Sequence, residues 1–199
     1  IWTITFWKSI GSPKKFNLLE LGAGNGEMMK VINETLLNFP ECYNACNFMI
    51  HEKSDFLINK QKKNLNIKKF KWIKDLKKIN KSPTIFLANE FFDAIPIKQF
   101  FKKQDIWFER YVSLKDIKNA EFKEKKINIK KVEQNLNFEI SKNQSIIEYS
   151  PVTFKYLKII CNLIQKNDGG MLIIDYGYAD SKMHETLQAV HNHKFSNIL

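Results

Sequence analysis

The stretch that decides the fold runs from residue 16 to residue 39 and reads FNLLELGAGNGEMMKVINETLLNF. Residues 16–21 form a short apolar run, which is typical of a buried strand. Three glycines at alternate positions follow, and residues 27–39 then carry the apolar spacing of a helix that ends before Pro40. A strand, a glycine loop and a helix in this order predict the opening of a βαβ unit.

The glycine loop itself restricts the ligand that it could hold. Its spacing is G-x-G-x-G, because position 27, where a dinucleotide-binding loop has its third glycine, is glutamate. Glu20 and Glu27 flank the loop and would repel the diphosphate of NAD, whereas S-adenosylmethionine carries an ammonium, a sulfonium and no phosphate. The charges therefore favour S-adenosylmethionine, and a tight turn without a ligand is the alternative.

The rest of the chain alternates strands and helices. Further strands are expected at residues 46–52, 70–75, 84–90 and 171–177, and further helices at residues 1–10, 54–65 and 151–166, with Ser54 as an N-cap. This order predicts an α/β protein with a Rossmann-like, mostly parallel sheet flanked by helices. Residues 97–140 show an alternating pattern instead, which indicates an inserted antiparallel, β-rich embellishment within a single domain of residues 1–199. The lysine-rich residues 115–131 are expected to form a solvated hairpin or loop, and the tail after Asp180 is left unassigned.

Composition narrows the possible partners. The net charge is +11, but Arg110 is the only arginine, and Lys, Asn and Ile supply 76 of the 199 residues, as adenine- and thymine-rich coding would produce. Because nucleic-acid recognition favours the forked arginine side chain, no specific nucleic acid is expected. Three cysteines, an odd number, indicate a reducing compartment, and Cys42 and Cys46 lack the further ligands of a metal site. No membrane-spanning run or targeting peptide is visible, and the first residue, Ile1, suggests a chain that begins inside a longer protein.

Polar residues at the ends of the second and third strands are candidate cofactor ligands. Glu52 ends the second strand, the topological place for ribose recognition, where a carboxylate can accept both ribose hydroxyls. Asp75 ends the third strand and could receive the adenine amino group. His51, a lone histidine without partners, is expected to be a packed or solvated residue.

The strongest cluster of candidate site residues follows the fourth strand. Asn89, Glu90 and Asp93 lie there in the stretch ANEFFDAIP, next to the point where open α/β sheets bind ligands. A site that methylates a guanidinium needs acidic groups to orient the fork, and Glu90 and Asp93 could supply them. Helix capping is the alternative role for these residues. Glu148 and Asp175 are further carboxylates at element ends that can be structural.

Several motifs together resemble one family. LLELGAGNG, LANEFFDAIPIKQF, FERYVSL, EYSP, GGMLIIDYGY and ETLQAVHNHK occur in the order found in MidA-like class I S-adenosylmethionine-dependent methyltransferases, whose mitochondrial members act as arginine methyltransferases in respiratory complex I assembly. The resemblance implies a class I methyltransferase fold and a piece of a longer protein. It also implies that Glu20 and the loop residues Gly22, Ala23, Gly24 and Gly26 hold the methionine part of the cofactor, with Glu52 on the ribose and Asp75 on the adenine edge.

The resemblance further predicts an enzyme that methylates arginine in a protein substrate, such as a respiratory-chain subunit. The predicted location is the bacterial cytoplasm, with the mitochondrial matrix as the alternative. Methylation of RNA or a small molecule, and a non-catalytic assembly factor that keeps the fold, are the competing functions. The residues Asn89-Glu90-Phe91-Phe92 lack the prolines that commonly follow the fourth strand in base amino-group methylases, which argues against a nucleic-acid substrate.

Overall fold

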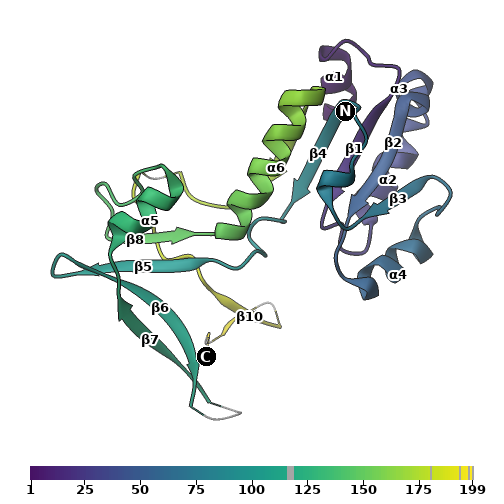
Figure 1. The fold of residues 1–199 in the computed structure, drawn as a ribbon. Helices are drawn as coiled ribbons and strands as arrows, with labels where there is room; N and C mark the ends of the chain where they lie inside the picture. The colour runs from purple at the N-terminus through teal and green to yellow at the C-terminus, as the bar shows by residue number, and fades with distance from the viewer. Residues whose placement is uncertain (116–118, 180, 193, 197, 199) are drawn as a thin grey trace. The chain divides into compact units, whose positions relative to one another are not determined.

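The chain folds into two compact units (Figure 1). The computed structural model describes residues 1–115, 119–179, 181–192, 194–196 and 198. The first unit comprises Ile1–Ile95 and Thr153–Tyr176, and the second comprises Pro96–Val152 and Gly177–Leu199. The sequence analysis treated residues 1–199 as one domain with a β-rich embellishment at 97–140, and the second unit contains that embellishment together with flanking residues.

A five-stranded parallel sheet forms the centre of the first unit, as the sequence predicted. Its strands are β1 (Phe16–Leu21), β2 (Cys46–His51), β3 (Phe70–Ile73), β4 (Thr84–Asn89) and β9 (Gly169–Ile174), in the order β3-β2-β1-β4-β9. The chain adds strands on one side of β1 and then crosses to the other side at β4. The loops that follow β1 and β4 therefore leave the same edge of the sheet from neighbouring strands, the usual ligand position in such folds.

Helices cover both faces of this sheet. They are α1 (Trp2–Ser9), α2 (Glu27–Leu36), α3 (Pro40–Ala45), α4 (Asp55–Asn64), the 3₁₀ helix η1 (Leu76–Lys78) and α6 (Pro151–Asn167). Successive strand residues point to opposite faces, so Leu18 packs in a core with Trp7, Met29 and Cys42 of α1, α2 and α3. Leu19 packs on the other face with Ile160 of α6.

Local sequence signals account for most of these elements. Ser54 caps α4 as expected, because its hydroxyl oxygen accepts a hydrogen bond from the Leu57 amide at 3.3 Å. The helix predicted over residues 27–39 is α2, which ends three residues earlier, at Leu36, and the short helix α3 that begins at Pro40 was not predicted. Proline fits the first turn of a helix, because the amide it lacks would be unpaired there anyway.

The second unit contains a four-stranded antiparallel sheet. Its strands are β5 (Lys98–Lys103), β6 (Ile106–Leu114), β7 (Ala120–Lys126) and β8 (Ile146–Tyr149), in the order β7-β6-β5-β8. Phe100, Trp107 and Ile147 on one face pack against Ile129 of helix α5 (Ile129–Leu136). A short hairpin of β10 (Ala189–His191) and β11 (Lys194–Ser196) belongs to the same unit. The sequence analysis missed α5, because it assigned all of residues 97–140 to an alternating pattern, although Ile129, Val132 and Leu136 have the spacing of one helix face.

Within the described part of the chain, no helix is both long enough and apolar enough to cross a membrane.

Gly169 provides a test of the pairing between β4 and β9. Its φ is +125°, and a Cβ atom there would lie 2.0 Å from the carbonyl oxygen of Thr84. We expect Gly169→Ala to lower the free energy of unfolding by more than about 3 kcal/mol, because neither backbone can move away without breaking the pair. Gly11→Ala is the matched control, since Gly11 has a φ of +86° and no atom within 4 Å of its added Cβ. It should cost only about 1 kcal/mol. Urea unfolding measures both, and equal midpoints would contradict the expectation.

Candidate functional site

The glycine loop is a tight turn between β1 and α2. Gly22, Gly24 and Gly26 have φ angles of +64°, +52° and +84°, in the left-handed region that favours glycine. The Gly22 amide donates to the carbonyl of His51 at 2.9 Å, and the Gly26 amide donates to the carbonyl of Ala23 at 2.7 Å. The sequence prediction of a glycine turn between a strand and a helix is therefore correct.

The three glycines differ in what lies beside them. A Cβ on Gly22 would lie 2.7 Å from Cδ2 of Phe91, and a Cβ on Gly26 would lie 3.0 Å from Cδ1 of Leu65. A Cβ on Gly24 would meet no atom within 4 Å. Packing explains the first and third glycines, whereas Gly24 presents bare backbone to open space, where a ligand can approach the loop.

Helix α4 holds the loop in place. The buried Gln61 donates from Nε2 to the carbonyl of Gly24 at 2.9 Å, and its Oε1 accepts from Nε1 of Trp72 at 2.8 Å. Asn64, one turn later, donates to the carbonyl of Asn25 at 3.0 Å. These bonds fix the backbone of the loop, so its exposed amides are preorganised.

Glu20 is a buried carboxyl group within β1. It is 3% exposed, and no described group hydrogen-bonds to its Oε2 atom. Burial raises the pKa of Glu20 to about 7, because desolvation disfavours the charged form. A cation brought to this oxygen would supply the missing partner. Glu20 lies two residues before the first glycine of the loop, and its assignment to a cofactor site stays a prediction.

The end of β2 carries two residues with different roles. Oε1 of Glu52 accepts from the amides of Lys53 and Ser54 at 2.8 and 2.9 Å, and its Oε2 has only a long contact of 3.4 Å to Nε2 of Gln61. Glu52 is thus fixed at the start of α4 with one oxygen still able to accept. His51 is buried between the carbonyl of Ile73, at 3.0 Å from Nδ1, and the hydroxyl of Tyr156, at 2.9 Å from Nε2.

The contacts and the burial of His51 together indicate its protonation. A carbonyl can only accept, so Nδ1 donates to Ile73, and in a neutral ring Nε2 then accepts from the Tyr156 hydroxyl. Burial lowers the pKa of His51, which favours this neutral form. A packed, neutral histidine matches the expectation from sequence.

Asp75 is exposed, and its Oδ1 accepts from the Lys77 amide at 3.0 Å as the N-cap of η1. Its proposed contact with adenine stays a prediction.

The loop after β4 contains the acidic residues predicted to bind a methyl acceptor. Asn89 ends β4, and Glu90 follows with a φ of +45°, a conformation that costs a non-glycine residue about 1 kcal/mol. The amide of Glu90 donates to the carbonyl of Ile174 at 2.9 Å, which fixes this backbone. Strained backbone of this kind clusters at functional sites.

Tyr176, beyond the end of β9, joins this acidic group. The pKa of its phenol is raised, first because the hydroxyl hydrogen-bonds to Asp93 and then because the charge of Asp93 opposes ionisation. Asp175 and Glu90 lie near enough to add smaller contributions. The structure therefore brings Glu90 and Asp93 together with Asp175 and Tyr176 at the edge of the sheet.

Aromatic packing joins the acidic loop to the glycine loop. Phe91 lies over Gly22, and its ring meets the Tyr156 ring edge-on, with centroids 5.2 Å apart. The Tyr156 hydroxyl donates to His51, so α6, β2 and both loops share one set of contacts.

Sequence reasoning missed four residues of this site: Gln61, Phe91, Tyr156 and Tyr176. Gln61 had a usable signal, because it occupies the same helix face as the apolar Ile58 and Leu65. The contacts of the three aromatic residues depend on the tertiary packing of distant segments.

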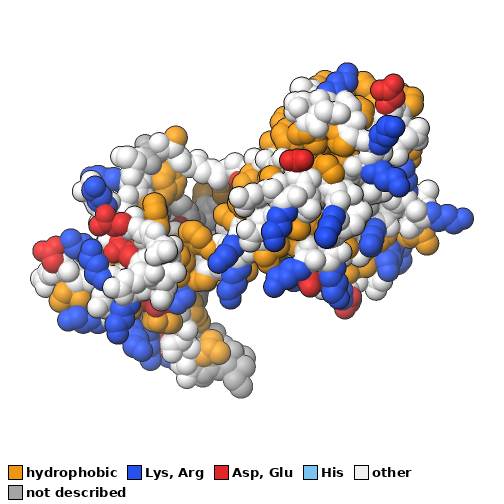
Figure 2. Space-filling view, turned by 45° about the horizontal axis from the view of Figure 1, so that its top comes forward, with side chains coloured by type: hydrophobic (Ala, Val, Ile, Leu, Met, Phe, Trp, Pro, Cys, Tyr) orange, Lys and Arg blue, Asp and Glu red, His pale blue; other side chains and the backbone are white. Residues whose placement is uncertain are grey.

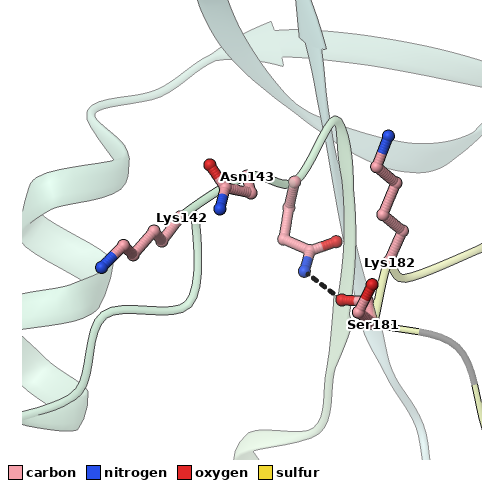
Figure 3. A pocket seen from close by; sticks show the side chains of 5 residues that line it. Lys142, Asn143, Ser181 and Lys182 are labelled. Atoms are coloured by element: carbon pink, nitrogen blue, oxygen red, sulfur yellow. Dashed lines mark hydrogen bonds between the residues drawn. The ribbon is translucent and has the colours of Figure 1, made fainter.

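A hollow in the second unit is a weaker candidate. It has a volume of about 540 Å³ and is lined by Lys142, Asn143, Gln144, Ser181 and Lys182. Gln144 donates from Nε2 to the carbonyl of Ser181 at 3.1 Å, and the ammonium groups of the two lysines point away from each other (Figure 3). No carboxylate, thiol or imidazole lines it. Across the described residues, no group of three or more His, Cys, Asp or Glu side chains could hold a metal ion.

Comparison with known proteins assigns the family. A family model with the description "Putative S-adenosyl-L-methionine-dependent methyltransferase" matches residues 1–199. The chain belongs to this family. The methyltransferase family that the motifs resembled is thereby confirmed.

Curated relatives include two mitochondrial proteins. The chain is 24% identical over 237 residues to the protein arginine methyltransferase NDUFAF7 of Xenopus tropicalis, covering 100% of the chain and 52% of that relative. It is 28% identical over 218 residues to the NDUFAF7 homolog of Caenorhabditis elegans, covering 98% of the chain and 50% of that relative. The chain thus spans about half the length of these relatives.

Two solved structures from Burkholderia thailandensis share the methyltransferase fold. One, crystallised with S-adenosyl-homocysteine, has a TM-score of 0.63 and 16% identity over 79% of this chain and 41% of that chain. The other has a TM-score of 0.67 and 17% identity over 88% of this chain and 47% of that chain. At this identity the likeness concerns the fold.

Glu20→Gln tests the burial of an unpartnered acid. A carboxyl whose pKa rises from 4.5 to about 7 on folding stabilises the folded state below pH 4.5, and that contribution is lost as the pH rises through 7. Glutamine keeps the shape and does not titrate. We therefore expect the difference in the free energy of unfolding, variant minus parent, to increase by about 2 kcal/mol when the pH is raised from 5 to 8. Urea unfolding at both pH values measures this, with the exposed Glu34→Gln as control. A difference independent of pH would contradict it.

Proposed function

We propose that this chain is part of an S-adenosylmethionine-dependent methyltransferase. One observation carries the proposal: the buried Glu20 carboxyl has an oxygen without a partner, two residues before a glycine loop whose Gly24 faces open space. The ammonium of the cofactor's methionine part is a cation that could pair with this oxygen, and bare backbone allows close approach. A diphosphate carries no cationic donor that could pair with this oxygen.

The residues present fit this cofactor. Glu20 would pair with the ammonium, and the loop residues Gly22, Ala23, Gly24 and Gly26 would lie along the methionine part. Glu52 would accept a ribose hydroxyl at Oε2, which has only one long contact, and Asp75 would receive the adenine amino group. When bound, the cofactor supplies a methyl group on a sulfonium sulfur. The family assignment and the neighbour crystallised with S-adenosyl-homocysteine support this cofactor.

The acceptor we propose is an arginine side chain of a protein. The relatives named as protein arginine methyltransferases support this substrate. A guanidinium is charged at any working pH and bonds strongly to carboxylates that match its fork. Glu90 and Asp93 would orient it, the amide of Asn89 would add a further hydrogen bond, and the Tyr176 hydroxyl would hold the Asp93 carboxylate.

Methyl transfer would require these residues to orient the acceptor and to accept one proton. A guanidinium nitrogen forms a bond to the methyl carbon while the carbon–sulfur bond breaks, and the electron pair of that bond leaves with the sulfur. The nitrogen gives up one proton in the process. Glu90 or Asp93 would accept this proton, as general-base catalysis requires a group within hydrogen-bond reach.

The relatives also guide a proposal for location and partner. Both curated relatives named above are mitochondrial, which supports the mitochondrial alternative for this chain over the bacterial cytoplasm. A respiratory-chain subunit is the protein substrate that we propose for this location.

Gly24→Val tests the cofactor site. A branched side chain at Gly24 would fill the open space above the loop, so we expect calorimetric binding of S-adenosylmethionine to the full-length protein to be abolished. Gly11→Val is the control, because Gly11 also has a positive φ with open space around it but precedes the opposite end of β1. It should bind like the parent. Binding of NAD by the parent as tightly as S-adenosylmethionine would overturn the cofactor assignment.

Glu90→Gln and Asp93→Asn test the acceptor site. Each variant should bind S-adenosylmethionine within a few-fold of the parent while turnover on the protein acceptor falls about 100-fold or more, because the lost interaction belongs to the transition state. Mass spectrometry of methylated arginine measures turnover, and Glu34→Gln controls for a lost surface charge. If either variant loses cofactor binding with its circular dichroism unchanged, that residue belongs to the cofactor pocket.

A further inference from the structure

The positive charge of the chain is concentrated in one segment. Residues 53–81 contain eleven lysines and two aspartates, a net charge of +9, whereas residues 1–52 have a net charge of −1. A coding bias acting evenly along the chain would spread lysines over all segments. This segment comprises α4, β3 and η1, and β3 is one edge of the parallel sheet. Figure 2 shows Lys and Arg side chains, in blue, gathered on the face of the first unit that it presents.

The fold decides which of these lysines face outward. Ile58, Gln61 and Leu65 are buried, and the bonds from Gln61 to the glycine loop and to Trp72 fix this inner face of α4. The opposite face carries Phe56, Lys60 and Lys63, at helix positions i, i+4 and i+7, which lie in line along a helix surface.

The turn after α4 also exposes a lysine and a large apolar side chain. It presents Ile67, which is 61% exposed, and Lys68, while Phe56 on the helix is 75% exposed. The outer face of α4 and this turn are called here the α4 surface: Phe56, Lys60, Lys63, Ile67 and Lys68. Two large apolar side chains are thus exposed on this lysine-rich surface, one in the first turn of α4 and one in the turn after the helix.

The described carboxylates form no ion pair with the lysines of this surface. In the part of the chain that the structure describes, the ion pair of the segment joins Lys74 to Asp55, and Lys62 and Lys69 lie over aromatic rings. No described carboxylate lies within 4 Å of the ammonium groups of Lys60, Lys63 or Lys68.

We propose that the α4 surface docks the protein on an anionic phospholipid membrane. Lysines supply diffuse attraction to lipid headgroups, and Phe56 and Ile67 enter the boundary between headgroups and acyl chains. Lysine alone, without arginine in the segment, suits a diffuse charged surface better than the bidentate recognition of nucleic-acid phosphates and bases. The exposed side chain of Ile67 is aliphatic, so it cannot stack on bases, but it can insert into the interface of a lipid bilayer. This docking does not depend on the proposed methyl transfer.

Vesicle sedimentation with the full-length protein tests the proposal. The parent should sediment with vesicles of phosphatidylcholine containing 30% phosphatidylglycerol, and not with pure phosphatidylcholine. The triple variant Lys60→Gln, Lys63→Gln, Lys68→Gln should bind on the order of 100-fold more weakly. Glutamine is a good helix former, so α4 should persist by circular dichroism.

A matched control separates this surface from net charge. Lys125→Gln, Lys126→Gln and Lys131→Gln together remove the same charge from exposed positions of the second unit, and this variant should bind vesicles like the parent. Equal weakening of both triple variants, or no binding by the parent, would overturn the proposal.

Phe56→Ser tests the apolar component at unchanged charge. It should weaken vesicle binding about tenfold, because the inserted ring is lost. Unchanged binding would mean that charge alone is recognised and would overturn the assignment to lipid. Binding of single-stranded RNA by the α4 surface at physiological salt, tighter than binding of vesicles and lost in the lysine variant, would also overturn it in favour of nucleic acid.

Discussion

The contact between Phe91 and Gly22 is the constraint on which the arrangement of the site depends. A Cβ on Gly22 would lie 2.7 Å from the ring of Phe91, so a side chain at position 22 would displace this ring from the loop after β1. Phe91 packs in turn on Tyr156, whose hydroxyl donates to the buried His51 at the end of β2. The two loops proposed to hold the cofactor and the acceptor thus share one packed boundary, and a shift in either would be transmitted to the other.

The site combines rigid support with groups left unsatisfied. Gln61 and Asn64 of α4 hold the glycine loop by its carbonyls, and Glu52 is fixed by two amides at the start of the same helix. Within this support Glu20 has an oxygen without a partner, at a cost to folding that rises with pH. Such local conflicts are expected where a protein trades stability for binding. A preorganised loop beside an unsatisfied acid has little further reorganisation to undergo when a cationic ligand arrives.

Helix α4 serves two purposes on its two faces. Its inner face, through Gln61, holds the glycine loop and the indole of Trp72, and this fixes the rotation of the helix about its axis. The same rotation turns Phe56, Lys60 and Lys63 outward. The contacts of Gln61 that hold the glycine loop therefore also orient the surface proposed to meet a membrane.

The sequence by itself predicted the five strands of the parallel sheet and the helices α1, α2, α4 and α6, since apolar periods, Ser54 and the glycine turn are local signals. It also located Glu20, Glu52, Glu90 and Asp93 at strand ends, because parallel strands end at one edge. Tertiary structure alone decided the strand order, the division into two units and the contacts of Gln61, Phe91, Tyr156 and Tyr176. It also decided that Gly24, and neither Gly22 nor Gly26, faces open space. The physical reason is that these properties depend on side chains brought together from segments far apart in the chain, which no local pattern encodes.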